Sequence, residues 1–276
     1  MSKKEANKRI KELIRKNIPF VIFREPGSSS RIIIQNSPLK LKQEVAIDQK
    51  GFYAFPFTSS ERANPLFYQP DVDLMLDKIS DANIDLKKLP APNSRDQNLY
   101  EVDREEYIED LKIYLNQFQD KEIHKAIYSR VQEDELDEDF DVLGFYSKLE
   151  SLYTRAFTYV MHIPGDGVWI GASPELLISY EDGIANTVAL AGTLKINAQK
   201  SAPDWTRKEI DEHRLVEKYI IALCAEKEIP MSKSKVRTSS TGKVYHLKSE
   251  FKMEIPKSQI AGFLKKLHPT PAISGL

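Results

Sequence analysis

The stretch that decides the fold runs from Thr158 to Leu190 and reads TYVMHIPGDGVWIGASPELLISYEDGIANTVAL. Apolar runs lie on either side of the turn Pro164-Gly165-Asp166-Gly167, a pattern that indicates an antiparallel hairpin. A second pair, Leu176–Tyr180 and Ile184–Leu190, repeats the pattern around Glu181-Asp182-Gly183. Because consecutive strands joined by short turns run antiparallel, this stretch predicts an antiparallel sheet.

Helical patterns occur on both sides of these hairpins. We expect helices over residues 1–17, over 104–118, through Leu149 and Tyr153, and from Trp205 to Lys227. The helix over 104–118 has Asp103 as its N-cap, and its expected buried side carries Tyr107, Leu111, Tyr114, Leu115 and Phe118. Helices covering one side of an antiparallel sheet predict an α+β fold.

The remaining segments divide the chain in two. We expect strands at 19–24, 31–35, 51–57 and 123–131, loops and a linker at 59–100, and a solvated acidic loop at 133–141. Residues 1–100 are interpreted as a variable N-terminal part of the fold, and residues 101–276 as the domain that carries the chemistry.

Composition excludes several classes of function. Forty Lys and Arg residues against 41 Asp and Glu give a net charge of −1, without the basic patch of a nucleic-acid-binding protein. No run is long and apolar enough to span a bilayer, and residues 1–16 lack the apolar core expected of a signal peptide. The single Cys224 is expected in the core and cannot form an internal disulfide, which fits a cytoplasmic protein. The sequence gives no sign of an obligatory protein partner.

Four motifs occur in a characteristic order: Ile123-His124-Lys125-Ala126-Ile127, Gly171-Ala172-Ser173-Pro174-Glu175-Leu176-Leu177, Ala191-Gly192-Thr193 and Leu267-His268-Pro269-Thr270-Pro271-Ala272-Ile273. In order and spacing they resemble the chorismate-utilising enzymes, and within that family the isochorismate synthases. The resemblance covers about residues 120–276. It implies the chorismate-binding fold, incomplete at its C-terminus, because chains of this family normally continue past this point.

Lys125 allows two interpretations. On a strand it shares a face with Ile123 and Ile127, either at a sheet edge with its amine in water or inside a pocket. The edge is the commoner case on pattern alone. The resemblance favours the pocket and implies that Lys125 is the base that activates the attacking water. Relatives that form anthranilate or aminodeoxychorismate typically have glutamine there.

Glu175 follows a proline that interrupts the strand pattern, and a solvent-exposed carboxylate is an equally good interpretation of the sequence alone. The resemblance implies that Glu175 is the general acid that protonates the departing C4 hydroxyl, a task suited to a carboxyl with a raised pKa. We therefore expect Lys125 and Glu175 to face a shared cavity.

Ala191-Gly192-Thr193 alone predicts only a glycine turn. The resemblance implies a substrate-binding segment, with Gly192 and Thr193 offering donors to a substrate carboxylate. Family members that form aminodeoxychorismate carry a lysine nucleophile at the position of Ala191, so alanine there implies that water or ammonia attacks from outside, and Ala191 together with Lys125 selects water. His246, Ala272 and Ile273 resemble further substrate-lining positions, although a lone histidine on a strand is more often structural.

Glu212 lies one turn before Val216, on the apolar face of the long predicted helix. A dipole-favourable surface charge is the ordinary interpretation, and it is strong for Glu209. The resemblance implies that Glu212 binds Mg²⁺, with a second glutamate beyond residue 276. Tyr128, together with His124, departs from the family pattern, which has small aliphatic residues there.

These residues predict an isomerase, an isochorismate synthase that converts chorismate to isochorismate with magnesium. A salicylate synthase and a non-catalytic, truncated chorismate-binding protein remain alternatives. Isochorismate serves both menaquinone and siderophore synthesis, and the sequence fits either. The chain as given is expected to lack measurable activity, because half of the metal site would be missing.

Overall fold

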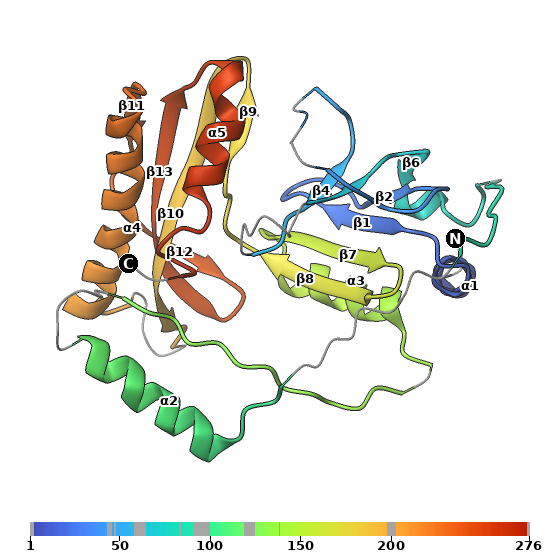
Figure 1. The fold of residues 1–276 in the computed structure, drawn as a ribbon, viewed down its shortest axis with the longest axis horizontal. Coiled ribbons are helices and arrows are strands. Elements are labelled where there is room, and N and C mark those ends of the chain that lie inside the picture. The colour runs from blue at the N-terminus through green and yellow to red at the C-terminus, as the bar shows by residue number, and fades with distance from the viewer. Residues whose placement is uncertain are drawn as a thin grey trace. The chain divides into compact units, whose positions relative to one another are not determined.

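The computed structural model describes residues 3–42, 46, 48–57, 65–82, 84–90, 100–118, 125–137, 139–197 and 203–274. The chain forms two compact units (Figure 1), Met1–Gln97 with Asp137–Pro174, and Asn98–Leu136 with Glu175–Leu276. Within the described part, no helix is both long and apolar enough to cross a membrane.

In the part of the chain that the structure describes, the first unit contains two antiparallel sheets and two α-helices. The larger sheet has the strand order β6-β2-β1-β7-β8, and the smaller has the order β3-β5-β4. The elements are α1 (Lys3–Arg15), β1 (Phe20–Arg24), β2 (Arg31–Ile34), β3 (Lys40–Leu41), β4 (Phe52–Ala54), β5 (Leu66–Tyr68), β6 (Val72–Met75), the 3-10 helix η1 (Leu76–Lys78), α3 (Val142–Leu152), β7 (Phe157–Ile163) and β8 (Gly167–Ser173).

Both faces of the larger sheet are covered, because apolar side chains of its strands point to both faces. Phe20 and Ile22 of β1 pack with α1 and α3 in one core cluster. Val21, between them, points to the opposite face and packs with Tyr68 of the smaller sheet. Because successive side chains of β1 enter cores on opposite faces, Phe20, Val21 and Ile22 are all apolar.

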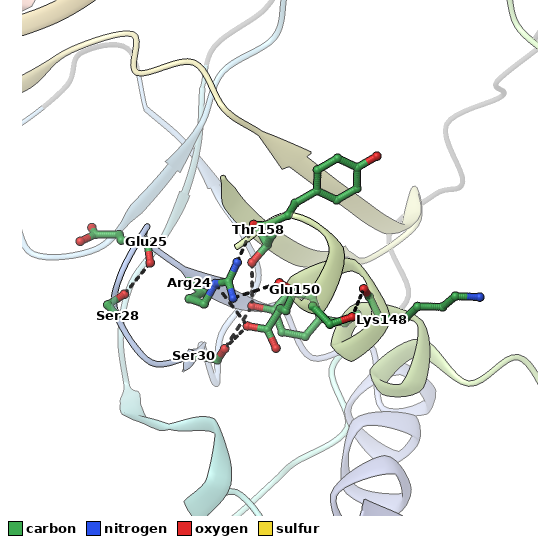
Figure 2. Close-up of polar contacts among 10 residues, drawn as sticks. Arg24, Glu25, Ser28, Ser30, Lys148, Glu150 and Thr158 are labelled. Carbon is green, nitrogen blue, oxygen red and sulfur yellow. Dashed lines mark hydrogen bonds and ion pairs between the residues drawn. The ribbon is translucent and has the colours of Figure 1, made fainter. Parts of the chain in front are cut away.

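A polar cluster attaches α3 to this sheet (Figure 2). The Arg24 guanidinium donates to the carbonyl of Tyr153 at 2.8 Å and to that of Glu150 at 3.3 Å, at the C-terminal end of α3. Ser30 donates to the Glu150 carboxylate, which also lies 3.6 Å from Arg24 Nε. A cation that satisfies the last carbonyls of a helix fixes where that helix ends.

The second unit is built on a long antiparallel ribbon, β10 with β13. Its sheet has the order β11-β13-β10-β9, and β12 also pairs with β13. The elements are α2 (Arg104–Gln117), β9 (Ser179–Glu181), β10 (Ile184–Lys195), α4 (Arg207–Glu226), β11 (Met231–Lys233), β12 (Arg237–Thr241), β13 (Val244–Glu254) and α5 (Lys257–Leu267). One core cluster joins this sheet to α4 and α5, and it includes the buried Cys224.

The predicted α+β fold with antiparallel sheets and flanking helices is confirmed. The expected helices correspond to α1, α2, α3 and α4, and the first hairpin corresponds to β7 and β8. Asp103 is the N-cap of α2, since its side chain accepts a hydrogen bond from the Glu106 amide.

Three expectations were wrong. Described residues 125–131 contain no strand, and no described strand pairs with them. Residues 59–100 contain β5, β6 and η1 as well as loops. The apolar side of α2 is not buried, and Leu115 is 63% exposed. Each error concerns tertiary pairing, which local patterns do not specify.

Candidate functional site

The amine of Lys125 is surrounded by oxygen atoms. Its Nζ donates to the carbonyl of Pro271 at 2.5 Å and to that of Ala272 at 3.3 Å. It also lies 3.1 Å from Oε1 of Glu212, and the lysine side chain is only 12% exposed. Of the two interpretations open from the sequence, this contact set agrees with an enclosed lysine and excludes one whose amine extends into water.

Glu175 is half-buried in the stretch that leads into β9. Burial raises the pKa of its carboxyl to about 7, and the nearby charge of Lys125 opposes that shift. Thr187 of β10 holds this stretch in place, because its hydroxyl donates to the Leu177 carbonyl at 2.6 Å. A carboxyl with a pKa near 7 can donate or accept a proton at neutral pH.

Gly192 lies where the register of β10 and β13 shifts, between the pairs Ala191–Leu247 and Thr193–His246. Its φ is +74°, and an added Cβ would lie 2.9 Å from the carbonyl oxygen of Glu209 in α4. Only glycine combines this backbone conformation with so close an approach. The resulting bulge directs the residues that follow it, as bulges beside functional sites often do.

Thr193 and His246 face each other across this ribbon. Thr193 Oγ1 lies 3.2 Å from Nδ1 of His246. Burial lowers the pKa of His246, and a hydrogen bond to the Gly192 backbone together with the charge of Glu212 opposes that shift. His246 therefore belongs to the same constellation as Glu212 and Lys125.

Glu212 projects from the second turn of α4, and its side chain is 31% exposed. The first turn is fixed by a capping box, since the Thr206 amide donates to Glu209 Oε2 at 3.1 Å. The interpretation of Glu209 as a surface charge was wrong, because Glu209 is only 8% exposed. The cap and the Gly192 contact together fix the helix end that presents Glu212.

A buried polar network lies beside the site. Ser249 of β13 donates to Glu217 Oε1 at 2.5 Å, and Lys233 donates to the same oxygen at 2.6 Å. The hydroxyl proton of Ser249 is thereby committed, so the 2.9 Å contact with His213 Nε2 requires that nitrogen to carry the proton. Burial lowers the pKa of His213, which agrees with a neutral ring.

The predicted site residues fall into two groups. The structure gathers Lys125, Glu175, Gly192, Thr193, Glu212, His246 and Ala272 in the second unit through the contacts and charge effects given above. Ala191 is 5% exposed and packs into the core, and Ile273 is 43% exposed. Both side chains are hydrocarbon, so no hydrogen bond or ion pair of theirs can link them to the constellation.

Magnesium requires hard oxygen ligands, and Glu212 supplies one carboxylate of that kind. Among the described residues, no group of three or more His, Cys, Asp or Glu side chains could hold a metal ion. Among the described residues, Glu212 can therefore supply one carboxylate toward Mg²⁺, and that carboxylate is paired with Lys125. The resemblance places the second glutamate beyond residue 276, so the described residues account for only part of the expected ligand set, with water and substrate oxygens as further ligands.

Sequence reasoning missed two features. The carbonyls of Pro271 and Ala272 bind Lys125 through the backbone, so their side chains give no signal. His213 and Glu217 do give one, since they are spaced i, i+4 within the apolar stripe of α4.

The comparisons with known proteins converge on one family. The family model described as "Chorismate binding enzyme" matches residues 59–276. The vibriobactin-specific isochorismate synthase of Vibrio cholerae is 26% identical over 62% of this chain and 46% of that protein. Isochorismate synthase MenF of Bacillus subtilis is 28% identical over 63% of this chain and 39% of that protein. The chain therefore spans less than half the length of these two curated relatives.

Solved structures show the same fold. The menaquinone-specific isochorismate synthase MenF of Escherichia coli aligns with a TM-score of 0.66 at 16% identity, covering 94% of this chain and 70% of that chain. Component I of anthranilate synthase from Streptococcus pneumoniae aligns with a TM-score of 0.55 at 16% identity, covering 93% and 72%.

Proposed function

We propose that this chain, which belongs to the family of chorismate-binding enzymes, carries the catalytic side chains of an isochorismate synthase. The observation that carries the proposal is that the enclosed Lys125 lies near enough to Glu175 for its charge to oppose the rise in the pKa of that carboxyl to about 7. Two groups able to exchange protons on neighbouring positions are what an exchange of hydroxyl groups on one ring requires.

In the proposed reaction, Lys125 in its neutral form accepts a proton from a water molecule as the water oxygen bonds to C2 of chorismate. The ring double bonds shift and the C4–O bond breaks. Glu175 donates its proton to the departing hydroxyl, which leaves as water. One water enters and one leaves, so the net reaction is an isomerisation.

The other residues would bind and orient the substrate. Thr193 offers a hydroxyl and His246 a ring nitrogen at the bulge of β10. Glu212 would hold Mg²⁺, which when bound neutralises the carboxylate of the substrate ring. Gly192 is proposed to offer a backbone donor to a substrate carboxylate, and Ala191, Ala272 and Ile273 are proposed to line the substrate. The substrate partner is chorismate, and Mg²⁺ is the proposed cofactor.

Product analysis tests this proposal. Purified chain is incubated with chorismate and Mg²⁺, and the products are separated by chromatography. Because the chain spans less than half of its curated relatives, the assay also includes the chain extended by the C-terminal segment of the Bacillus subtilis relative. Isochorismate, absent in a Lys125→Gln variant, would support the proposal.

Two other outcomes would replace it. Salicylate with pyruvate would assign the chain to the salicylate synthases, which eliminate pyruvate from the same intermediate. Chorismate that binds and is recovered unchanged from both proteins would indicate a non-catalytic binding protein.

A further inference from the structure

The ring of Tyr128 lies between two tyrosines of α2. Its centroid is 5.0 Å from that of Tyr107 and 5.3 Å from that of Tyr114, with interplanar angles of 39° and 51°. Tilted pairs at these distances are favourable contacts between aromatic rings. Tyr128 is thus enclosed on two sides by side chains of one helix.

The spacing of these residues on α2 matches the shape of a tyrosine side chain. Tyr107, Asp110 and Tyr114 follow the i, i+3, i+7 spacing, which places them in one stripe along the helix. Asp110 lies between the two aromatic residues. The stripe therefore offers two aromatic contacts for a ring and one acceptor for its hydroxyl.

The polar tip of Tyr128 uses that acceptor. Its hydroxyl donates to Oδ2 of Asp110. This hydrogen bond raises the pKa of Tyr128 to about 12, so the phenol remains a donor at neutral pH. A hydrogen bond to an ionised acceptor is stronger than one between neutral groups.

Residues 125–131 depend on such side-chain contacts, because none of them lies in a strand and no described strand pairs with them. Lys125 anchors the start of this segment through the Pro271 carbonyl and Glu212. Three residues later, Tyr128 attaches the segment to α2. Figure 1 shows this extended segment passing beside α2 within the second unit.

We propose that Tyr128 is a positioning residue for Lys125, and that α2 acts through it to hold the lysine amine among its oxygen partners. This inference rests on the proposed function, in which Lys125 is the base. It assigns a role to the aromatic residue that departs from the family pattern, and to a helix with no buried residue of its own.

Chemical labelling of Lys125 tests the positioning directly and does not depend on activity. The full chain is treated with trace acetic anhydride, and acetylation of Lys125 is quantified by mass spectrometry relative to the exposed Lys252. We expect Tyr128→Leu to raise the relative rate of acetylation about fivefold, because loss of the contacts between Tyr128 and α2 increases local opening of residues 125–131. Tyr128→Phe, which keeps the ring and loses the hydroxyl, should give a smaller increase.

Variants of the partner residue supply the matched controls. Asp110→Leu removes the acceptor and should raise the labelling of Lys125, whereas Asp110→Asn retains an acceptor oxygen and should restore protection. Ile113→Ala alters a 60% exposed residue of the same helix and should leave the rate unchanged. Should Tyr128→Leu unfold the chain, Tyr128→Phe and the Asp110 pair give the decision. Unchanged labelling in Tyr128→Phe and Asp110→Leu would overturn the proposal.

Turnover separates this inference from the function on which it rests. In the form that converts chorismate, Tyr128→Phe should lower kcat, with KM within about twofold, because the chemical step loses positioning while ground-state binding is retained. Faster labelling of Lys125 without a fall in kcat would support the positioning of Lys125 by Tyr128 and contradict the role of Lys125 as the base.

Discussion

The side-chain nitrogen of Lys125 lies 3.1 Å from a carboxylate oxygen of Glu212, and neither side chain is more than 31% exposed. This pair joins a segment without strand partners to the second turn of α4. The same amine donates to the Pro271 carbonyl, so three parts of the sequence converge on one side chain. The convergence brings residues nearly 150 positions apart into contact with one amine.

Glu175 gives a prediction about pH. Its raised pKa means that, between pH 4.5, the usual pKa of a glutamate, and about pH 7, the folded state holds a proton that the unfolded state has already lost. The free energy of unfolding should therefore fall as pH rises through that range, by at most ~3 kcal/mol. Urea unfolding at pH 5 and pH 8 measures this, and Glu175→Gln should remove the difference.

The matched control for Glu175 is Glu181→Gln, which alters an exposed carboxyl of β9. It should leave the pH dependence of the parent chain intact. The same titration should appear in turnover, which is expected to decline above about pH 7 as the general acid loses its proton. A turnover that increases from pH 7 to pH 9 would contradict the acid role.

Gly192 gives a prediction about stability. Gly192→Ala should lower the free energy of unfolding by about 1–3 kcal/mol, because alanine disfavours the positive φ and would crowd Glu209. Gly262→Ala in α5 is the control, since a Cβ there meets no atom within 4 Å. That change should be neutral or stabilising by ~0.5–1 kcal/mol. Equal effects of the two substitutions in chemical denaturation would refute the proposed strain.

The buried network predicts a cost for Ser249→Ala. The substitution removes a donor to the Glu217 carboxylate and the acceptor of His213 Nε2, so we expect a loss of about 1–3 kcal/mol in unfolding free energy. Ser179→Ala, at an exposed position in β9, should change stability by less than about 0.5 kcal/mol. Thermal unfolding of both variants measures the difference. A Ser249→Ala protein as stable as its parent would show that the network contributes nothing net.

Local sequence signals identified the elements that form mainly by themselves. The apolar stripe of α4 and the turn between β7 and β8 were sufficient to predict those elements. The prediction of a strand around Lys125 was wrong, because the sequence pattern describes only the segment itself. A strand also needs the backbone of a neighbouring strand for its hydrogen bonds. The short strands β5 and β6 were missed because prolines bordering them resembled a linker.

The candidate site shows the same division. Lys125, Glu175, Glu212 and His246 could be named from motifs, and the structure places them in one unit. The contact of Lys125 with the Pro271 carbonyl and that of Tyr128 with Asp110 depend on the tertiary structure and could not be predicted from motifs. The candidate catalytic side chains occur in recognisable sequence motifs, whereas the groups that position them do not.

The most direct test of the account compares Lys125→Gln with the parent chain, both extended by the C-terminal segment of the Bacillus subtilis relative. Turnover of chorismate with Mg²⁺ is measured beside calorimetric binding of chorismate. Glutamine retains the size and a hydrogen bond but cannot accept a proton, so the account predicts a loss of at least about 100-fold in kcat with binding largely retained. Turnover within about tenfold of the parent, a barrier difference of only ~1.4 kcal/mol, would show that Lys125 is not the base.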